Sequence, residues 1–236
     1  MKEEAHTQAL GRAQALREGL RSCRLCPRQC GVDRLGGRKG VCGLDATVRW
    51  FREMVIDYEE SPLNPSHQVY FAGCNLGCAF CSVQEWNLEP EAARPMDLRG
   101  LAAVIEQRRR QGARTLNLLG GEPAVSVHGI VELLARVDVR TTVVWNSNMY
   151  YGDHVARALD GLVDIYLADL KCGNATCAER LLGAGDYLDV VRANILGARA
   201  VGDVIVRHLI LPGHLDCCLG PTLEWIAQHA PDLKVS

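Results

Sequence analysis

The chain lacks the features that would direct it to a membrane, to secretion or to a polyanion. No apolar run approaches the roughly 18 residues that a membrane-spanning helix needs. Residues 1–6 are polar and charged, without the hydrophobic core of a signal peptide. A net charge of -2 provides no field that would gather nucleic acid or an anionic membrane. We therefore expect a cytoplasmic protein that binds neither nucleic acid nor membranes.

Cysteine, in contrast, is abundant. The 236 residues include 11 cysteines, whereas the shares of hydrophobic (48%) and charged (23%) residues are ordinary for a globular protein. Because cytoplasmic thiols stay reduced, metal binding explains these cysteines better than disulfides do, and their odd number agrees.

From residue 68 onward, short apolar strands alternate with helical stretches. The expected strands are residues 68–72, 115–119, 142–146, 164–170 and 204–211. The expected helices are residues 98–111, 128–137, 153–159, 177–200 and 223–229. Repeated βα units predict an α/β fold with parallel strands joined by right-handed crossovers. Residues 232–236 look like the start of a sixth strand, which we expect to be truncated.

The amino-terminal part is expected to form a separate segment. Residues 4–20 have the pattern of an amphipathic helix, and residues 48–58 that of one or two short strands. A turn-rich connector at residues 61–66 marks the boundary. The prediction is a helix and cysteine-rich metal-binding segment in residues 1–60, and a barrel in residues 61–236.

The amino-terminal segment contains four cysteines with the spacing C-x2-C-x3-C-x11-C, namely Cys23, Cys26, Cys30 and Cys42. Four thiolates in a short, glycine-containing segment can close a tetrahedral zinc site or hold a second iron–sulfur cluster. Since so small a segment has little core, the metal would supply much of its folding free energy. Free core cysteines are the alternative.

Three further cysteines, Cys74, Cys78 and Cys81, follow the apolar strand at residues 68–72 with the spacing C-x3-C-x2-C. Three thiolates can hold a [4Fe–4S] cluster and leave one iron open to a small molecule. A zinc knuckle or unrelated core cysteines are the alternatives. The pattern resembles the radical S-adenosylmethionine (SAM) superfamily, whose signature has an aromatic residue before the third cysteine, here Phe80.

The carboxyl ends of the other strands carry residues suited to a reactive site, which is where α/β barrels place them. Gly120-Gly121-Glu122-Pro123 follows the second strand. Its glycines allow a ligand to approach the backbone closely, and its carboxylate can receive an ammonium group. The tetrapeptide resembles the GGEP element of the superfamily, which binds the amino group of SAM. Taken alone, it could be an ordinary turn.

The later strands end in polar pairs that share a face by the alternation of strand residues. Asn146 and Asn148 can point their amides inward, or can be turn formers. Asp169 and Lys171 can partner each other or the methionine part of SAM. Arg207, in an apolar strand, suggests a carboxylate to hold or a structural salt bridge.

The Asp-Leu-Lys element and the R-x-x-x-x-P-G strand that begins at Arg207 resemble the pyruvate formate-lyase-activating enzymes and their uncharacterised relatives. The likeness runs from the cysteine loop to the end of the chain. It implies a curved, partly closed (β/α)6 barrel, a [4Fe–4S] cluster and SAM. The amino-terminal cysteines are absent from the true activases, so installation of a glycyl radical does not follow directly.

The resemblance implies that the open iron chelates SAM and that one electron from the reduced cluster breaks its S–C5′ bond. The resulting 5′-deoxyadenosyl radical takes hydrogen from a substrate, as the activases do from a protein glycine. A flavodoxin- or ferredoxin-like electron donor and a protein or peptide substrate are the implied partners. The implied cofactor-binding residues are Phe80, which would contact the adenine, and Gly120, Gly121, Glu122, Asn146, Asn148, Asp169, Lys171 and Arg207.

A non-catalytic iron–sulfur or zinc protein that transfers electrons or binds a partner is the alternative. It would not explain why successive strands each carry polar residues at the same face of the barrel. The remaining cysteines follow the fourth and fifth strands and could act as redox thiols, extra ligands or a radical relay, although free buried thiols are common. They are Cys172, Cys177, Cys217 and Cys218. His67, His208 and His214 lack metal-ligand spacing and are expected to be structural or surface residues.

Overall fold

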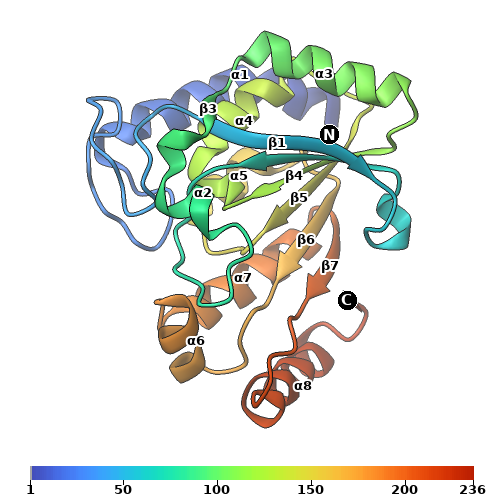
Figure 1. Ribbon diagram of the computed structural model, residues 1–236. Helices are drawn as coiled ribbons and strands as arrows, with labels where there is room; N and C mark the ends of the chain where they lie inside the picture. Colours follow the sequence, from blue (N-terminus) through green and yellow to red (C-terminus); the bar gives the residue numbers. More distant parts are fainter. Residues whose placement is uncertain (1) are drawn as a thin grey trace.

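A single curved sheet runs through the part of the chain that the computed structural model describes, residues 2–236 (Figure 1). Its strands are β1 (Arg49–Ile56), β2 (Ser66–Phe71), β3 (Arg94–Pro95), β4 (Thr115–Gly120), β5 (Thr142–Ser147), β6 (Ile165–Asp169), β7 (Asp203–Arg207) and β8 (Lys234–Val235). They are ordered β3-β1-β2-β4-β5-β6-β7-β8. β2, β4, β5, β6, β7 and β8 pair in parallel, each with the next. β1 pairs antiparallel with both β2 and β3.

The expected parallel strands are all present, so the α/β prediction with a partly open sheet is confirmed. Their register aligns the carboxyl ends along one edge of the sheet. Phe71 at the end of β2 pairs with Gly120 of β4, and Asp169 at the end of β6 pairs with Arg207 of β7. Residues that follow these strands are therefore brought together, although they are far apart in the sequence.

Helices α1, α3 and α4 lie together near the β1 end of the sheet, and α6, α7 and α8 lie near the β6–β7 end (Figure 1). The helices are α1 (Lys2–Gly19), α2 (Gln84–Leu88), α3 (Leu98–Arg110), α4 (Val127–Leu134), α5 (Asp153–Leu159), α6 (Ala175–Leu182), α7 (Tyr187–Arg199) and α8 (Gly220–His229). None of the helices in residues 2–236 is long and apolar enough to cross a membrane.

The single helix predicted for residues 177–200 is wrong, because two helices occupy this stretch. Gly183 has φ 68° and ends α6 in the left-handed conformation that glycine adopts without steric cost. Its N–H donates to the carbonyl of Glu179, and the chain re-enters a helix at Tyr187. The break directs the last turn of α6 toward the cysteine loop that follows β2.

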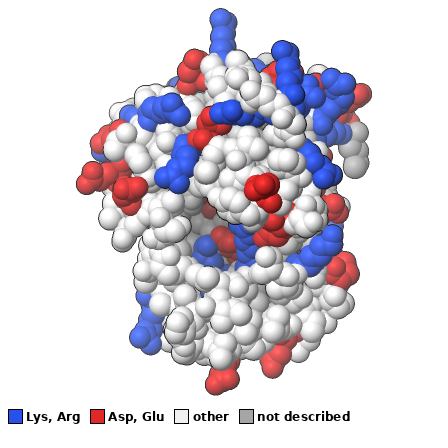
Figure 2. All heavy atoms as spheres, turned by 45° about the vertical axis from the view of Figure 1, so that its right-hand side comes forward, with Lys and Arg blue, Asp and Glu red and all other residues white. Residues whose placement is uncertain are grey.

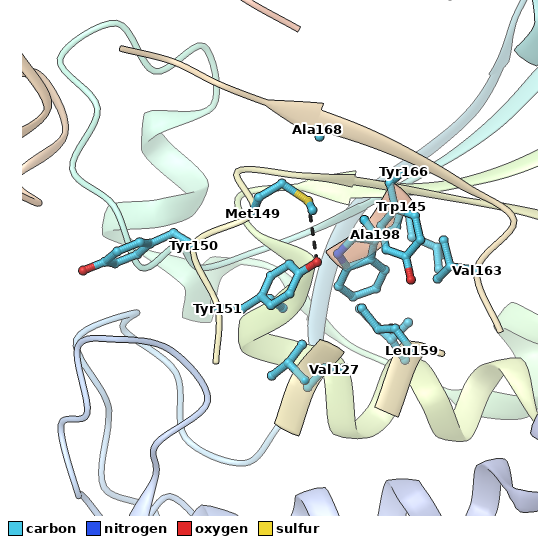
Figure 3. Packing of buried hydrophobic residues seen from close by; sticks show 14 of the residues in the cluster. Val127, Trp145, Met149, Tyr150, Tyr151, Leu159, Val163, Tyr166, Ala168 and Ala198 are labelled. Carbon is cyan, nitrogen blue, oxygen red and sulfur yellow. Dashed lines mark hydrogen bonds between the residues drawn. The ribbon is translucent and has the colours of Figure 1, made fainter. Parts of the chain in front are cut away.

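The core lies between the sheet and its helices, and alternation along β5 separates this core from the site. Trp145 is fully buried in a cluster with Val127 of α4 and Leu159 of α5 (Figure 3). The next residue, Asn146, is on the other face of the strand and lines a cavity. One face of β5 thus stabilises the fold while the other is available for chemistry.

The amino-terminal part shares this core. Helix α1 buries the small side chains of Ala5, Ala9 and Ala13 in the same hydrophobic cluster as α4 and α5. Their spacing of four residues puts them on one face of the helix, which allows a close approach to α4. Strand β1 extends the sheet beside β2. The division at residues 60 and 61 remains a prediction.

Candidate active site

A cavity of about 640 Å³ opens at the carboxyl ends of the parallel strands. All but one of the residues predicted to bind the cluster or SAM line it. These are Cys74, Cys78, Phe80, Cys81, Gly120, Gly121, Asn146, Asn148, Asp169, Lys171 and Arg207. The space-filling view shows a hollow with Lys or Arg and Asp or Glu atoms gathered inside it (Figure 2). The fold therefore assembles residues from five strand ends into one site.

The cysteine loop is fixed by backbone hydrogen bonds to α6. The N–H of Gly77 donates to the carbonyl of Leu182 at 2.9 Å, and that of Ala79 donates to the carbonyl of Leu181 at 2.8 Å. The last carbonyls of a helix have no partner within the helix, so they are free to accept these bonds. On the other side of the loop, the Asn75 amide donates to the carbonyl of Tyr150 at 2.6 Å.

The three cysteines of this loop are half-buried. Burial raises the pKa of the Cys74 thiol, and the nearby carboxylate of Glu122 raises it further. Burial also raises the pKa of Cys78, although Lys171 opposes the shift. All three cysteines of the loop are free, so their sulfurs are available as metal ligands.

The distances between these sulfurs can be compared with those expected for ligands of a single metal ion. Among residues 2–236, the Sγ atoms of Cys74, Cys78 and Cys81 are not all within 4.8 Å of one another. Sulfur ligands of one tetrahedral zinc ion would be about 3.8 Å apart, from Zn–S bonds of about 2.3 Å. These three sulfurs are therefore not gathered as closely as the ligands of one zinc ion would be.

Two glycines allow the Gly-Gly turn to approach the cysteine loop. Gly120 has φ 126°, and a Cβ there would lie 2.2 Å from the carbonyl oxygen of Phe71. A Cβ on Gly121 would lie 2.3 Å from the carbonyl oxygen of Gly73. Any other residue would push the two loops apart. Both glycines thus serve the packing of two loops, and the close approach of a ligand at this turn remains a prediction.

Glu122 is the one predicted cofactor-binding residue that does not line the cavity. Its carboxylate is fully buried and accepts hydrogen bonds from the Ser147 hydroxyl at 2.8 Å, the Asn148 N–H at 2.8 Å and the Ala124 N–H at 2.9 Å. Burial raises its pKa to about 7, although these hydrogen bonds oppose the shift. In this structure Glu122 links the Gly-Gly turn to the end of β5, and its contact with SAM remains a prediction.

The two predicted amides differ in how firmly they are held. The Asn148 amide donates to Asn75 Oδ1 at 2.9 Å and lies 3.8 Å from Cys74 Sγ, so it connects β5 to the cysteine loop. Asn146 lines the cavity and is 9% exposed. The structure thus places both amides inward, as the alternation predicted.

Asp169 and Lys171 form an ion pair in the cavity wall, with Lys171 Nζ 2.5 Å from Asp169 Oδ2. Burial opposes the charge on Lys171, but Asp169 and the thiol of Cys78 outweigh it and raise the pKa of the lysine. The two residues therefore partner each other, which was one of the two expected arrangements. Their binding of SAM remains a prediction.

Arg207 also lines the cavity, but two carboxylates already hold its guanidinium. It donates from Nε to Glu60 Oε1 at 2.6 Å and from Nη2 to Glu60 Oε2 at 2.7 Å, and it also pairs with Glu59. Burial would raise the pKa of Glu60, yet Arg207 lowers it to about 2. These contacts match the salt-bridge alternative, and SAM binding by Arg207 remains a prediction.

The four amino-terminal cysteines lie in a single segment but not around a single point. No three of their Sγ atoms, within residues 2–236, are all within 4.8 Å of one another. A Cβ on Gly40 would lie 3.3 Å from Cys30 Sγ and 3.4 Å from Cys42 Sγ, so these two side chains flank the glycine. Binding of zinc or of a second cluster by these four cysteines remains a prediction.

Sequence reasoning named Cys177, Cys217 and Cys218 as possible extra ligands but missed the histidine that joins them. His214, expected to be structural or at the surface, lies with Cys177, Cys217 and Cys218, and the four ligand atoms are all within 4.8 Å of one another. His208 is structural as expected, since its ring Nδ1 lies 2.5 Å from the carbonyl oxygen of Leu170. The adjacent Cys217 and Cys218 were the only local signal, and they did not indicate which histidine would join them.

Comparison with known proteins identifies the family. Residues 69–226 match the family model of the radical SAM superfamily. The chain belongs to this superfamily. It is 34% identical over 225 residues to an uncharacterised protein of Methanocaldococcus jannaschii, covering 92% of this chain and 65% of that relative. It is also 31% identical over 170 residues to 7-carboxy-7-deazaguanine synthase of Methanothermobacter thermautotrophicus, covering 68% of each.

Among solved structures, the chain is similar in fold to Streptococcus suis SuiB bound to its precursor peptide SuiA, with a TM-score of 0.54. The two are 14% identical, and the alignment covers 66% of this chain and 35% of SuiB. Because the chain spans less than two thirds of the first relative above, the activity of the whole protein is a matter for proposal. Family membership implies an enzyme with a [4Fe–4S] cluster and SAM as cofactors.

Proposed function

We propose that this protein is a radical SAM enzyme that abstracts a hydrogen atom from a substrate bound over the cavity. When bound, the cluster and SAM supply an electron and a 5′-deoxyadenosyl radical. The observation that carries the proposal is the convergence of the C-x3-C-x2-C loop with polar side chains from the other strand ends in one cavity. A non-catalytic electron carrier has no need for that convergence.

Within this proposal, each group of residues has a separate task. Cys74, Cys78 and Cys81 hold the cluster, and Phe80 covers the adenine. The amide of Asn146 and the Gly-Gly turn orient the polar end of SAM, and the Asp169–Lys171 pair supplies compensating charge beside it. The buried walls exclude water and competing hydrogen donors.

We further propose that the substrate is a polypeptide and that the hydrogen comes from a glycine, in the manner of the pyruvate formate-lyase-activating enzymes. The order of the Asp-Leu-Lys element and the R-x-x-x-x-P-G strand supports this subgroup. A wide cavity with charged residues in its wall suits an extended chain. The cluster must receive its electron from outside the protein, and we propose a flavodoxin- or ferredoxin-like donor.

Two measurements test the parts of this proposal separately. Addition of SAM to the reduced protein should shift the electron paramagnetic resonance spectrum of its cluster, and an unchanged spectrum would favour a non-catalytic role. For the substrate, polypeptide and small-molecule fractions of a deuterated cell extract are supplied in turn. Deuterium in 5′-deoxyadenosine is expected with the polypeptide fraction. Transfer from the small-molecule fraction alone would overturn the polypeptide assignment and leave the radical chemistry intact.

A further inference from the structure

Four potential metal ligands meet between α6 and the segment that follows β7. Nδ1 of His214 lies 3.6 Å from Cys177 Sγ, 3.3 Å from Cys217 Sγ and 3.8 Å from Cys218 Sγ. The Sγ atoms of Cys177 and Cys217 are 3.8 Å apart. We call these four residues the Cys/His group. All three of its cysteines are free, and Cys177 is 9% exposed while Cys218 is 3% exposed.

These separations match the edges of a tetrahedron around one metal ion. With Zn–S bonds of about 2.3 Å and Zn–N bonds of about 2.0 Å, two sulfurs lie about 3.8 Å apart and a sulfur and a nitrogen about 3.5 Å apart. We propose that Cys177, His214, Cys217 and Cys218 bind one divalent zinc-type ion. Because all four positions are filled by protein ligands, the site is structural rather than catalytic.

The backbone around the Cys/His group is built to hold the ligands close. The Asn174 side chain caps α6 by accepting from the N–H of Cys177 at 2.8 Å, and its amide donates to the carbonyl of Cys217 at 2.5 Å. A single asparagine therefore connects the segment after β6 to the segment after β7. Cys217 and Cys218 lie on a π-helical turn, Leu215–Leu219, and π-type turns occur often at functional sites.

A close backbone contact brings the same two segments together. A Cβ on Gly173 would lie 2.3 Å from the carbonyl oxygen of Cys218 and 2.7 Å from its Cα. The approach is thus possible only for glycine at this position. Capping, a π-helical turn and a glycine contact all converge on the point where the four ligand atoms meet.

The position of this site gives it a consequence for the cavity. Cys177 lies in the first turn of α6, and the last turn of α6 accepts the hydrogen bonds of Gly77 and Ala79 from the cysteine loop. A metal ion bound by the Cys/His group would fix α6 at one end while α6 supports the cluster-binding loop at the other. We therefore expect loss of this metal to weaken retention of the cluster.

A disulfide or a second [4Fe–4S] cluster fits the geometry less well. A Cys177–Cys217 disulfide would require oxidation. It would use only two of the four side chains that meet and would not account for His214 and Cys218. The four ligand atoms of the Cys/His group all lie within 4.8 Å of one another, which matches ligands gathered around a single ion. The buried thiol of Cys172 lies beside Cys218 but is not one of the four ligand atoms that meet, so Cys172→Ser controls for the loss of a neighbouring thiol that does not bind the ion.

The test is the zinc content of the full chain, purified anaerobically and measured per chain together with iron. Cys177→Ser and Cys217→Ser are expected to contain one zinc ion fewer than the unmodified protein, and Cys172→Ser the same number. Equal zinc content in all variants would overturn the proposal. A serine variant that loses iron while its zinc content is unchanged would overturn it as well. So would a Cys177–Cys217 disulfide found in the protein as isolated.

A second variant keeps the test decisive if the serine variants do not fold. His214→Cys preserves a four-ligand site, so it should keep its zinc. When cobalt(II) replaces the zinc, the added thiolate should increase the sulfur-to-metal charge-transfer absorption and move the ligand-field bands. An identical cobalt spectrum for His214→Cys and the unmodified protein would show that His214 is not a ligand.

Discussion

Two groups of four potential ligands occur in this chain, and they relate to the sequence in opposite ways. The amino-terminal cysteines, Cys23, Cys26, Cys30 and Cys42, have a regular local spacing but do not bring three sulfurs within 4.8 Å of one another in residues 2–236. The Cys/His group is spread from residue 177 to residue 218, yet all of its ligand atoms are this close. Regular spacing of cysteines in the sequence therefore indicates that a segment can bind metal. Which ligand atoms lie close together depends on the folded backbone.

The difference has a physical origin in what each group depends on. The four amino-terminal cysteines lie in a loop that is organised around buried Arg34. This arginine donates to the carbonyl oxygens of Asp45 at 2.7 Å and Val125 at 3.0 Å. A metal ion there would have to draw the sulfurs closer as it binds. The Cys/His group is instead positioned by the pairing of β6 with β7 and by α6.

Replacement of all four amino-terminal cysteines by serine should produce the largest effect on metal content and folding. We expect loss of the metal that this segment binds and a decrease of several kcal/mol in the free energy of unfolding, because metal binding here is coupled to local folding. Metal analysis and urea unfolding measure the two effects. A metal content that does not change would reject this site and leave the Cys/His group as the only structural one proposed.

A pair of glycine substitutions compares how tightly each group is enclosed. Gly173→Ala should cost about 3 kcal/mol, because the new Cβ would overlap the backbone of Cys218. Gly40→Ala should cost less than about 1 kcal/mol, because the atoms nearest its Cβ belong to movable side chains, Cys30 Sγ at 3.3 Å and Cys42 Sγ at 3.4 Å. Thermal or urea unfolding of both variants provides the comparison. Equal costs would mean that metal already fixes the amino-terminal sulfurs.

A smaller effect is expected from the buried histidine that joins α4 to the amino-terminal segment. His128 Nε2 lies 3.0 Å from the carbonyl oxygen of Ala46, and burial lowers the pKa of His128 to about 4. The unfolded chain therefore binds a proton on this residue near pH 6.5 while the folded chain stays neutral. The stability that depends on neutral His128 is present above pH 6.5 and is lost as the pH falls toward 4.

Between pH 7.5 and pH 5.5 this loss amounts to about 1.4 kcal/mol. His128→Gln has no proton to gain in this range, so its unfolding free energy should fall by that much less than that of the unmodified protein. Urea titrations of the two proteins at both pH values measure the difference. Parallel pH profiles would show that His128 is not the residue responsible.

The parts of the fold that depend on local patterns were predicted well. The strands β4 and β5 begin at Thr115 and Thr142, where the apolar runs indicated, because a buried parallel strand is nearly continuous in hydrophobic residues. The break between α6 and α7 was missed, since Gly183 lies within an otherwise helical pattern. In the site, the C-x3-C-x2-C loop and the polar strand ends were placed together correctly.

The remaining features depend on contacts between distant residues. Arg207 pairs with Glu60 across 147 positions of sequence, and no local signal connects them. Glu122 was expected at the cavity, but its three hydrogen-bond partners turn it into the core. His214 joins its cysteines only because α6 and the segment after β7 converge. In each case the fold had to be known before the partner could be named.

The measurement that most directly tests the central claim is formation of 5′-deoxyadenosine by the anaerobically reconstituted, chemically reduced protein supplied with SAM. Cys78→Ala, with its residual iron content checked, is compared with Cys172→Ala as a buried thiol outside the C-x3-C-x2-C loop. The account predicts product from the unmodified protein and from Cys172→Ala, and none from Cys78→Ala. Equal product from Cys78→Ala, or no product from unmodified protein with a verified cluster, would contradict it.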